Sequence, residues 1–345
     1  ALGMDPESGL FWTGWPFRAA WYALWSAPGR KLIAKGRHDP LTDYFGVAYD
    51  LSRKRLLMWR AEDDRLAVDA LTFDGSLEPL GTLAIEARSA CWRPPNDRWF
   101  AVSDDQNVYV IEFGEHGLSE PQRIEQLEGQ VDQVECDPLG RFVAARYEDS
   151  QIRIWRLDGR SQPAVIRGPS ESSGLRIADD GSLLEVWGIN RETDRRQTWI
   201  YSLETQEPTL LRHIELGKDG GSAGWALNTV NLQLVSILNP DPNIRLWPLQ
   251  VPADTEPIVI RREDAGLHLG LSIQPQGDWF ATSGSTGLTL WPLAQTYPTV
   301  IEKYQERTRL VFGPDGGWFA TGSVDGRGSV RLWQLEGDGL PPARI

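Results

Sequence analysis

Cysteine, histidine and long apolar runs are scarce in this chain of 345 residues. The two cysteines, Cys91 and Cys136, cannot build a disulfide framework. They lie 45 residues apart, so we expect them as buried free thiols on similar inner strands of neighbouring repeats. The four histidines are widely spread, which disfavours a metal cluster.

Two kinds of targeting segment are also missing from the sequence. No run of about 18 apolar residues is present, so no transmembrane helix is predicted. The acidic, polar start lacks the basic region of a secretory signal. These features predict a cytoplasmic protein, although the chain could be part of a longer one.

Positive charge is in the minority, with 35 Lys and Arg residues against 48 Asp and Glu residues and a net charge of −13. Phosphate binding needs a basic surface, so a nucleic-acid partner is disfavoured. An anionic membrane surface is disfavoured for the same reason, except through the first forty residues, which hold the chain's only basic stretch.

A repeat dominates what the sequence does contain. Four segments alternate apolar and polar residues and then present a tryptophan followed two positions later by leucine, at Trp155, Trp247, Trp291 and Trp333. This alternation is typical of strands. Tyr201, Ile111 and Asp69 take the tryptophan position in three further segments, so the ends recur at steps of 42 to 46 residues and define seven units.

A second pattern precedes these strands. Four segments place alanine six residues after a proline, with Gly or Asp between them: PPNDRWFAV (94–102), CDPLGRFVAA (136–145), IQPQGDWFAT (273–282) and FGPDGGWFAT (312–321). Proline followed by a polar residue and Gly or Asp is turn chemistry that joins two strands in a hairpin.

Four antiparallel strands in about 40 to 45 residues make one propeller blade. The sequence therefore predicts an all-β fold, a seven-bladed β-propeller of four-stranded blades over residues 39–345. The recurring tryptophans are expected to pack between blades; they are Trp99, Trp155, Trp247, Trp279, Trp291, Trp318 and Trp333.

These residues resemble the WD-repeat (WD40) family, most clearly over residues 136–155 and 312–333 and more weakly over residues 45–335. The resemblance implies that turn aspartates brace the blades. The residues at that position are Asp105, Asp149, Asp241 and Asp325. The family's Gly-His pair is missing and no tryptophan is followed by aspartate, so the usual His–Ser–Asp brace cannot form and the blades are expected to rely more on aromatic packing. This degenerate pattern looks like that of prokaryotic propellers.

Residues 1–38 do not fit the repeat. PFRAAWYALWS (16–26) predicts a short amphipathic helix with an aromatic stripe. That helix could pack on the propeller or dock on a membrane interface or another domain. KLIAKGR (31–37) could supply the outer strand of the last blade and close the ring.

No catalytic motif, cofactor-binding motif or metal-binding motif is present. Acid pairs such as Asp63-Asp64, Asp104-Asp105 and Asp179-Asp180 fall in predicted turns and are read as solvated. We predict a non-catalytic, monomeric scaffold that binds a protein or peptide through loops at one propeller end. Alternatives are a sensor or regulatory domain of a larger protein, such as a signalling enzyme, and a propeller hydrolase or lactonase. The partner-binding candidates at the inner-strand entries are Arg88, Gln130, Trp225, His268, Arg307 and Arg309.

Overall fold

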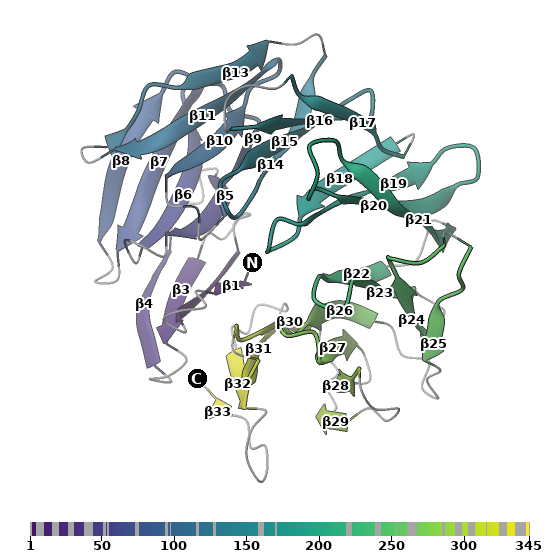
Figure 1. Ribbon diagram of the computed structural model, residues 1–345. Coiled ribbons are helices and arrows are strands. Elements are labelled where there is room, and N and C mark those ends of the chain that lie inside the picture. The colour runs from purple at the N-terminus through teal and green to yellow at the C-terminus, as the bar shows by residue number, and fades with distance from the viewer. Residues whose placement is uncertain are drawn as a thin grey trace. The chain divides into compact units, whose positions relative to one another are not determined.

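A computed structural model gives the structure of the chain (Figure 1). The structure describes residues 2–4, 10–15, 21–26, 31–37, 44–50, 53, 55–72, 76–93, 96, 98–114, 117–126, 129–157, 162–169, 171–218, 223–238, 243–252, 254–260, 268–284, 287–293, 299–302, 308–314, 316–323, 330–334 and 343–344.

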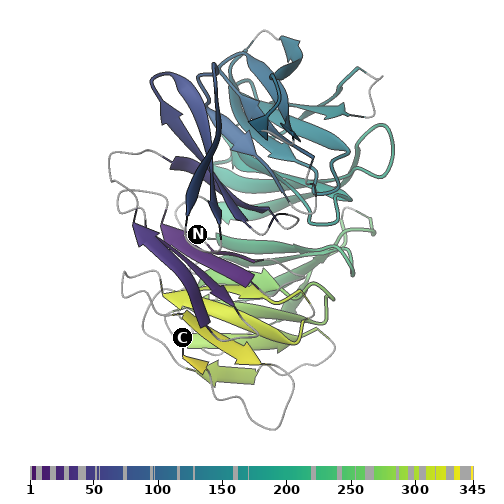
Figure 2. The same cartoon turned by 90° about the vertical axis from the view of Figure 1, so that its left-hand side faces the viewer.

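The described residues form strands only, arranged in eight antiparallel sheets (Figures 1 and 2). The chain divides into two compact units. One comprises Ala1–Thr13, Leu24–Ile33 and Leu216–Ile345, and the other comprises Gly14–Ala23 and Ala34–Glu215.

The first five sheets follow the chain order. The first is β1 (Leu2–Met4), β2 (Leu10–Trp15), β3 (Trp21–Ser26) and β4 (Lys31–Arg37). The second is β5 (Tyr44–Asp50), β6 (Arg55–Glu62), β7 (Arg65–Thr72) and β8 (Leu77–Leu83). The third is β9 (Ser89–Cys91), β10 (Trp99–Ser103), β11 (Asn107–Gly114), β12 (Gly117–Leu118) and β13 (Gln122–Gln126), with both β12 and β13 paired to β11. The fourth is β14 (Val131–Cys136), β15 (Phe142–Tyr147), β16 (Gln151–Arg156) and β17 (Ala164–Arg167). The fifth is β18 (Glu171–Ile177), β19 (Leu183–Asn190), β20 (Arg195–Ser202) and β21 (Thr209–Lys218).

The last three sheets repeat the same order. The sixth is β22 (Ala223–Asn228), β23 (Gln233–Leu238), β24 (Ile244–Pro248) and β25 (Ile258–Ile260). The seventh is β26 (His268–Ile273), β27 (Trp279–Gly284), β28 (Gly287–Pro292) and β29 (Thr299–Glu302). The eighth is β30 (Thr308–Phe312), β31 (Trp318–Ser323), β32 (Val330–Gln334) and β33 (Ala343–Arg344).

The prediction for the N-terminal segment was wrong in three respects. The expected helix is a strand over its described part, Trp21–Ser26, because Trp and Tyr favour strands and a sheet partner overrides the helical spacing. Residues 31–37 form the outer strand of this first sheet, whereas β33 is the outer strand of the last one. The described strands thus make eight sheets, one more than the seven predicted blades.

The predicted Pro-Gly hairpins are confirmed. In the β14–β15 turn, the amide of Asp137 donates to the carbonyl of Phe142 at 3.0 Å, and that of Gly140 donates to the carbonyl of Asp137 at 2.9 Å. Gly140 has φ of +72°, a left-handed conformation that glycine adopts without strain. The β26–β27 and β30–β31 turns make equivalent bonds.

Tryptophan strands pack as the sequence predicts. Trp99, Trp155, Trp291 and Trp333 are buried. The remaining three of the set, Trp247, Trp279 and Trp318, are partly buried. Within the seventh sheet Phe280 stacks on Trp291, and within the eighth Phe319 stacks on Trp333, each pair with ring centroids 5.7 Å apart. Between sheets, Trp291 packs in a cluster with the sixth sheet and Trp333 in a cluster with the seventh.

Side-chain hydrogen bonds also join strands within three of the sheets. The indole N–H groups of Trp291 and Trp333 donate to the hydroxyls of Thr282 and Thr321 at 3.0 Å. Trp247 makes the same bond to a serine. Each bond joins the second strand of a sheet to the third and so ties the two strands together in these three sheets.

The cores lie between consecutive sheets. Buried apolar residues of β9–β13 and β14–β17 form one cluster around Trp99 and Trp155. Other clusters join the second sheet to the third, the fourth to the fifth, the sixth to the seventh and the seventh to the eighth. Within these two runs of sheets, second to fifth and sixth to eighth, neighbouring sheets bury apolar faces against each other, as stacked repeats require.

Side chains also fasten one sheet to the turn of the next. Gln274 donates to the carbonyl of Gly316 at 3.1 Å, and Asn231 donates to that of Gly277 at 2.9 Å. Arg141 donates to the carbonyl of Gly181 at 2.9 Å. All three glycines have positive φ, so these turns are fixed by both conformation and side-chain contacts.

The two cysteines form a disulfide, contrary to the expectation of free thiols. Cys91 ends β9 and Cys136 ends β14, so they do lie on equivalent inner strands of neighbouring sheets, as predicted. The two Cα atoms are 5.6 Å apart, within the distance that a disulfide spans. The sequence spacing placed the cysteines correctly but did not show this approach.

Candidate interaction surface

One end of the third, fourth and fifth sheets carries four of the residues singled out in the sequence: Arg88, Asp105, Gln130 and Asp149. There the entries of the inner strands β9, β14 and β18 lie beside the turns between the second and third strands. The amide of Val131 donates to the carbonyl of Asp105 at 2.9 Å, and that of Glu148 donates to the carbonyl of Gln130 at 3.1 Å. We call this region the end face and define it by Glu86, Arg88, Asp105, Gln130, Glu148, Asp149, Glu171 and Arg191.

Arg88 is exposed on the end face and also contacts two carboxylates there. Its Nε donates to Asp105 at 2.9 Å, and its Nη2 lies 3.6 Å from the Glu86 carboxylate. The hydrogen bond to Asp105, together with both carboxylates, raises the pKa of Arg88. Arg88 stands just before the inner strand, where the WD-repeat pattern expects histidine, and it bonds to the predicted turn aspartate.

Both partners of this ion pair are about half exposed, at 50% for Arg88 and 51% for Asp105. An ion pair of this exposure stabilises a fold weakly, so a partner could compete for it. Sequence reasoning singled out both residues but did not pair them.

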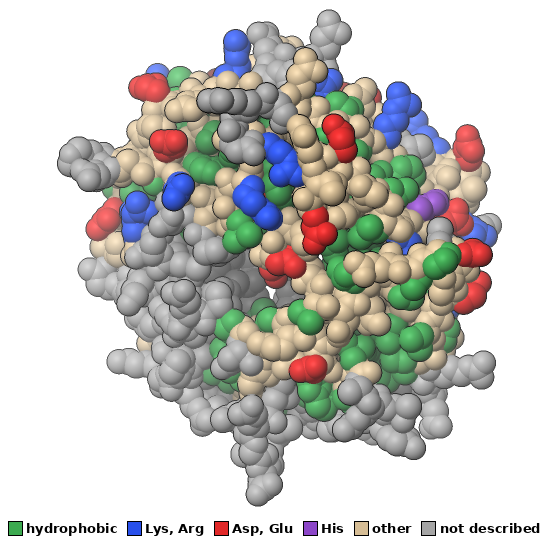
Figure 3. All heavy atoms as spheres, in the orientation of Figure 1, with side chains coloured by type: hydrophobic (Ala, Val, Ile, Leu, Met, Phe, Trp, Pro, Cys, Tyr) green, Lys and Arg blue, Asp and Glu red, His purple; other side chains and the backbone are tan. Residues whose placement is uncertain are grey.

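The fifth sheet carries the same pair with reversed charges. Glu171, the first residue of β18, accepts a hydrogen bond from Arg191 in the β19–β20 turn. The end face therefore presents arginine and carboxylate groups in alternation. Figure 3 shows the same mixture on the face it draws, where Lys and Arg side chains lie among Asp and Glu.

Gln130 and Asp149 lie on the end face between these two pairs, and both are exposed. Asp149 accepts the backbone amide of Gln151 at 3.0 Å within the β15–β16 turn. Gln130 contributes its carbonyl to the fold and leaves its side chain exposed.

The turn before β11 is organised by Asp104. Burial raises the pKa of Asp104, but hydrogen bonds from the Asn107 side chain, the backbone amides of Gln106 and Asn107, and the Tyr109 hydroxyl outweigh it and lower the pKa overall. Burial and the bond to Asp104 raise the pKa of Tyr109 to about 12. Asp104 therefore holds the turn on which Asp105 is presented.

The other predicted residues all belong to the other unit. Trp225 lies in β22 of the other unit, partly buried and with partners of its own. His268 and Arg309 belong to β26 and β30, with side chains outside the described residues. Arg307, Asp241 and Asp325 lie wholly outside the described residues.

Sequence reasoning missed a network on the inner strands. Arg93, after β9, lies 3.2 Å from the carboxylate of Glu135 in β14 and also donates to the carbonyl of Ile177 and to Asp179. Burial raises the pKa of Glu135, and Arg93 opposes that shift. The only sign of this network in the sequence was the polar residues of the inner strand VDQVEC (131–136). Besides Glu135, Gln133 of this strand bonds twice to the backbone of Leu175.

Metal-ligating side chains do not cluster in the described residues. These residues contain no group of three or more His, Cys, Asp or Glu side chains that could hold a metal ion. Asp63 and Asp64 form the β6–β7 turn with positive φ, as predicted for turn residues. Within the described ranges no helix is long and apolar enough to cross a membrane.

Comparison with known proteins agrees with a WD-repeat propeller fold for these repeated four-stranded sheets. The family model "WD domain, G-beta repeat" matches residues 307–334. No curated protein matches the chain.

Solved structures of similar fold cover nearly the whole chain. The C-terminal WD40 domain of Sif2 is 14% identical, with a TM-score of 0.62, and the match covers 97% of this chain and 95% of that one. Chaetomium thermophilum Sqt1, bound to the N-terminus of the ribosomal protein L10, is 14% identical with a TM-score of 0.64 and 93% coverage of both chains. Kuenenia stuttgartiensis hydrazine synthase is 12% identical with a TM-score of 0.55, covering 85% of this chain and 95% of that one.

At this identity the comparisons show the fold alone, which is that of a WD40 β-propeller. The comparisons support a WD-repeat fold for this chain. They do not identify its activity, because propellers host many functions, so a function must be proposed from the candidate surface.

Proposed function

We propose that this chain is a non-catalytic interaction scaffold that binds a protein or peptide partner through the end face. The observation that carries the proposal is a pair of ion pairs of reversed orientation: Arg88 and Glu171, at inner-strand entries, bond to Asp105 and Arg191, on hairpin turns. Loops held by a rigid scaffold are where binding residues concentrate.

The charge pattern indicates what kind of partner suits this surface. Two exposed ion pairs of opposite orientation flank the acidic pair Glu148-Asp149. Paired charges of both signs give orientation and specificity more than raw affinity. A partner with a basic centre flanked by polar groups of both signs would match this arrangement.

Support for protein binding also comes from the fold, since Sqt1, which shares it, is bound to the N-terminus of a ribosomal protein. The non-enzymatic character belongs to the proposal, because the same fold class also includes hydrazine synthase. Cytoplasmic localisation and a monomeric state likewise remain predictions. The membrane-docking alternative loses its basis, since the described part of the expected helix is a strand.

The test uses a partner captured with the whole chain and then purified. Its affinity is measured by calorimetry for the parent, for the double variant Glu148→Lys/Asp149→Lys and for the control Glu78→Lys on the exposed outer strand β8. Reversing two rim charges is expected to weaken binding about tenfold or more. Equal affinity for all three proteins would reject the end face as the binding surface.

A further inference from the structure

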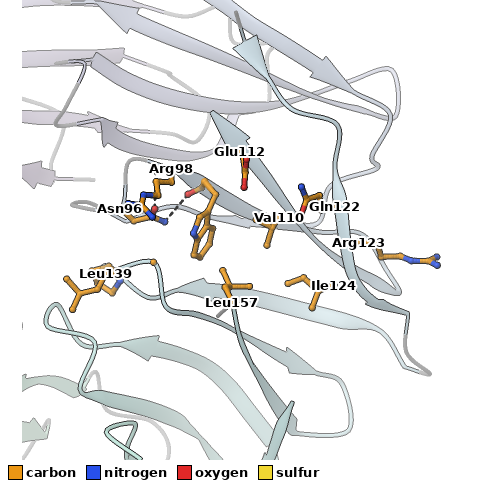
Figure 4. Close-up of a pocket in the computed structure, with 12 residues that line it drawn as sticks. Asn96, Arg98, Val110, Glu112, Gln122, Arg123, Ile124, Leu139 and Leu157 are labelled. Atoms are coloured by element: carbon orange, nitrogen blue, oxygen red, sulfur yellow. Dashed lines mark hydrogen bonds between the residues drawn. The ribbon is translucent and has the colours of Figure 1, made fainter. Parts of the chain in front are cut away.

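A groove of about 610 Å³ lies between the third and fourth sheets, away from the end face (Figure 4). Its lining includes Trp99, Val110, Ile124, Leu139 and Leu157, with Glu112 at the rim. Trp99 and Val110 belong to the core that these two sheets share. The groove is therefore the open outer part of an interface that is otherwise packed.

The equivalent place between the fourth and fifth sheets is closed. The cavity there, lined by Phe142, Ile154, Arg156 and Leu203, has a volume of only about 20 Å³. Arg156 fills the gap. Its guanidinium lies 5.8 Å from the centre of the Phe142 ring and donates to the carbonyls of Leu203, at 3.1 Å, and Thr205.

Strand register shows that Glu112 occupies the position of Arg156. Trp99 pairs with Glu112 at the start of the hairpin β10–β11, as Phe142 pairs with Arg156 in β15–β16. A carboxylate accepts hydrogen bonds but donates none, so Glu112 cannot bond to the carbonyl of Leu157, the counterpart of Leu203. The groove is open because this one position carries the opposite charge.

The Glu112 carboxylate has no hydrogen-bond or ion-pair partner among the described residues. In Figure 4 it points into the space above Val110 and Leu157, while the Arg123 side chain extends away from that space. An exposed fraction of 52% makes Leu139 one of the more exposed large apolar side chains of the described chain, and it lies at the other side of the groove.

We propose that this groove binds an arginine side chain from a peptide segment of a partner protein. The guanidinium supplies from outside what Arg156 supplies within the chain: a planar cation beside an aromatic ring that donates to a backbone carbonyl. In this groove it also meets the carboxylate of Glu112. The net charge of −13 favours approach of such a basic segment.

The volume leaves room for more than the arginine. Apolar neighbours in the peptide contact Leu139, Ile124 and Leu157, which gives the segment an arginine flanked by aliphatic residues. Arg98 at the rim disfavours a second cation close by, so a run of basic residues fits less well than a single one.

The probe is a short fluorescein-labelled peptide with one arginine between leucines in a Gly-Ser background. Matched peptides carry glutamine or glutamate in place of the arginine. Fluorescence anisotropy with the full chain is expected to show binding of the arginine peptide, weaker binding of the glutamine peptide and no binding of the glutamate peptide.

Two variants and a control test the geometry. Glu112→Arg is expected to close the groove as Arg156 does and to abolish binding, while keeping or raising the unfolding midpoint. Glu112→Gln keeps the size, loses the charge and is expected to weaken binding about tenfold. Glu78→Gln on β8 is expected to bind as the parent does.

Tighter binding of the glutamate peptide would overturn the proposal, because it would assign the groove to an acidic ligand held by Arg98. Equal binding to the parent and Glu112→Gln, or no binding of any peptide, would also overturn it. The double variant Glu148→Lys/Asp149→Lys should bind the probe normally, so failure of this proposal is distinguishable from failure of the end-face proposal.

Discussion

Reduction of the disulfide between Cys91 and Cys136 is expected to destabilise the chain strongly. The bond closes a loop with a sequence separation of 45 residues between the inner strands of two neighbouring sheets. In the chain-entropy description, a loop of that length corresponds to about 4 kcal/mol of stability at room temperature. This is a large part of the stability of an ordinary domain.

The assay is guanidinium denaturation of the purified chain with and without a phosphine reductant. Cys136 is fully buried and Cys91 nearly so, so the reductant must act during denaturation and refolding rather than on the native protein. The reductant should lower the unfolding midpoint of the parent. The double variant Cys91→Ser/Cys136→Ser should unfold at the lower midpoint and ignore the reductant.

Thiol titration of the denatured protein provides the decisive control. Protein purified without reductant should show no free thiols before reduction and two after it, one for each cysteine. Two reactive thiols before reduction, together with a midpoint that the reductant does not change, would refute the disulfide and restore the original interpretation of two buried thiols.

Two further predictions concern a turn and a partly buried tyrosine. Gly316→Ala is expected to cost about 1 kcal/mol or more, because Gly316 has φ of +69° and an added Cβ would lie 2.1 Å from Nε2 of Gln274. Gly322→Ala, where an added Cβ meets nothing within 4 Å, is the matched control, and thermal unfolding compares the two; equal losses would contradict the contact. The Tyr109 phenol, with its pKa raised to about 12, adds stability that is complete below its ordinary pKa of 10.0 and is lost as pH rises through about 12. Absorbance titration of tyrosinate should show one fewer late-ionising group in Tyr109→Phe, and loss of a group that ionises near 10 instead would contradict the bond to Asp104.

The hairpin and the tryptophan strand could be predicted from the sequence because each leaves a local signal. The spacing from Pro138 to Ala144 specifies a turn and a buried strand, and the structure has both. Alternation around Trp155 and Trp333 gave the third strands of their sheets correctly. Such signals depend only on neighbours in the chain.

Features that depend on partners distant in the sequence were missed. Trp21 and Trp25 fit a helical face as well as a strand, and only pairing in the first sheet selects the strand. Glu112 and Arg156 can be recognised as equivalent positions of opposite charge only when the strand register aligns the two sheets. Likewise, Arg88 was chosen for its position alone, and its bond to Asp105 appears only when the turn is in place.

Amide hydrogen exchange of the chain, alone and with its purified partner, tests the central claim most directly. An end-face scaffold predicts slower exchange on binding in the turns at residues 104–107 and 148–151. It predicts no change in the turn at residues 178–182, at the opposite end of the fifth sheet and outside the arginine groove. Protection confined to residues 178–182, or none in any of these turns, would contradict the account.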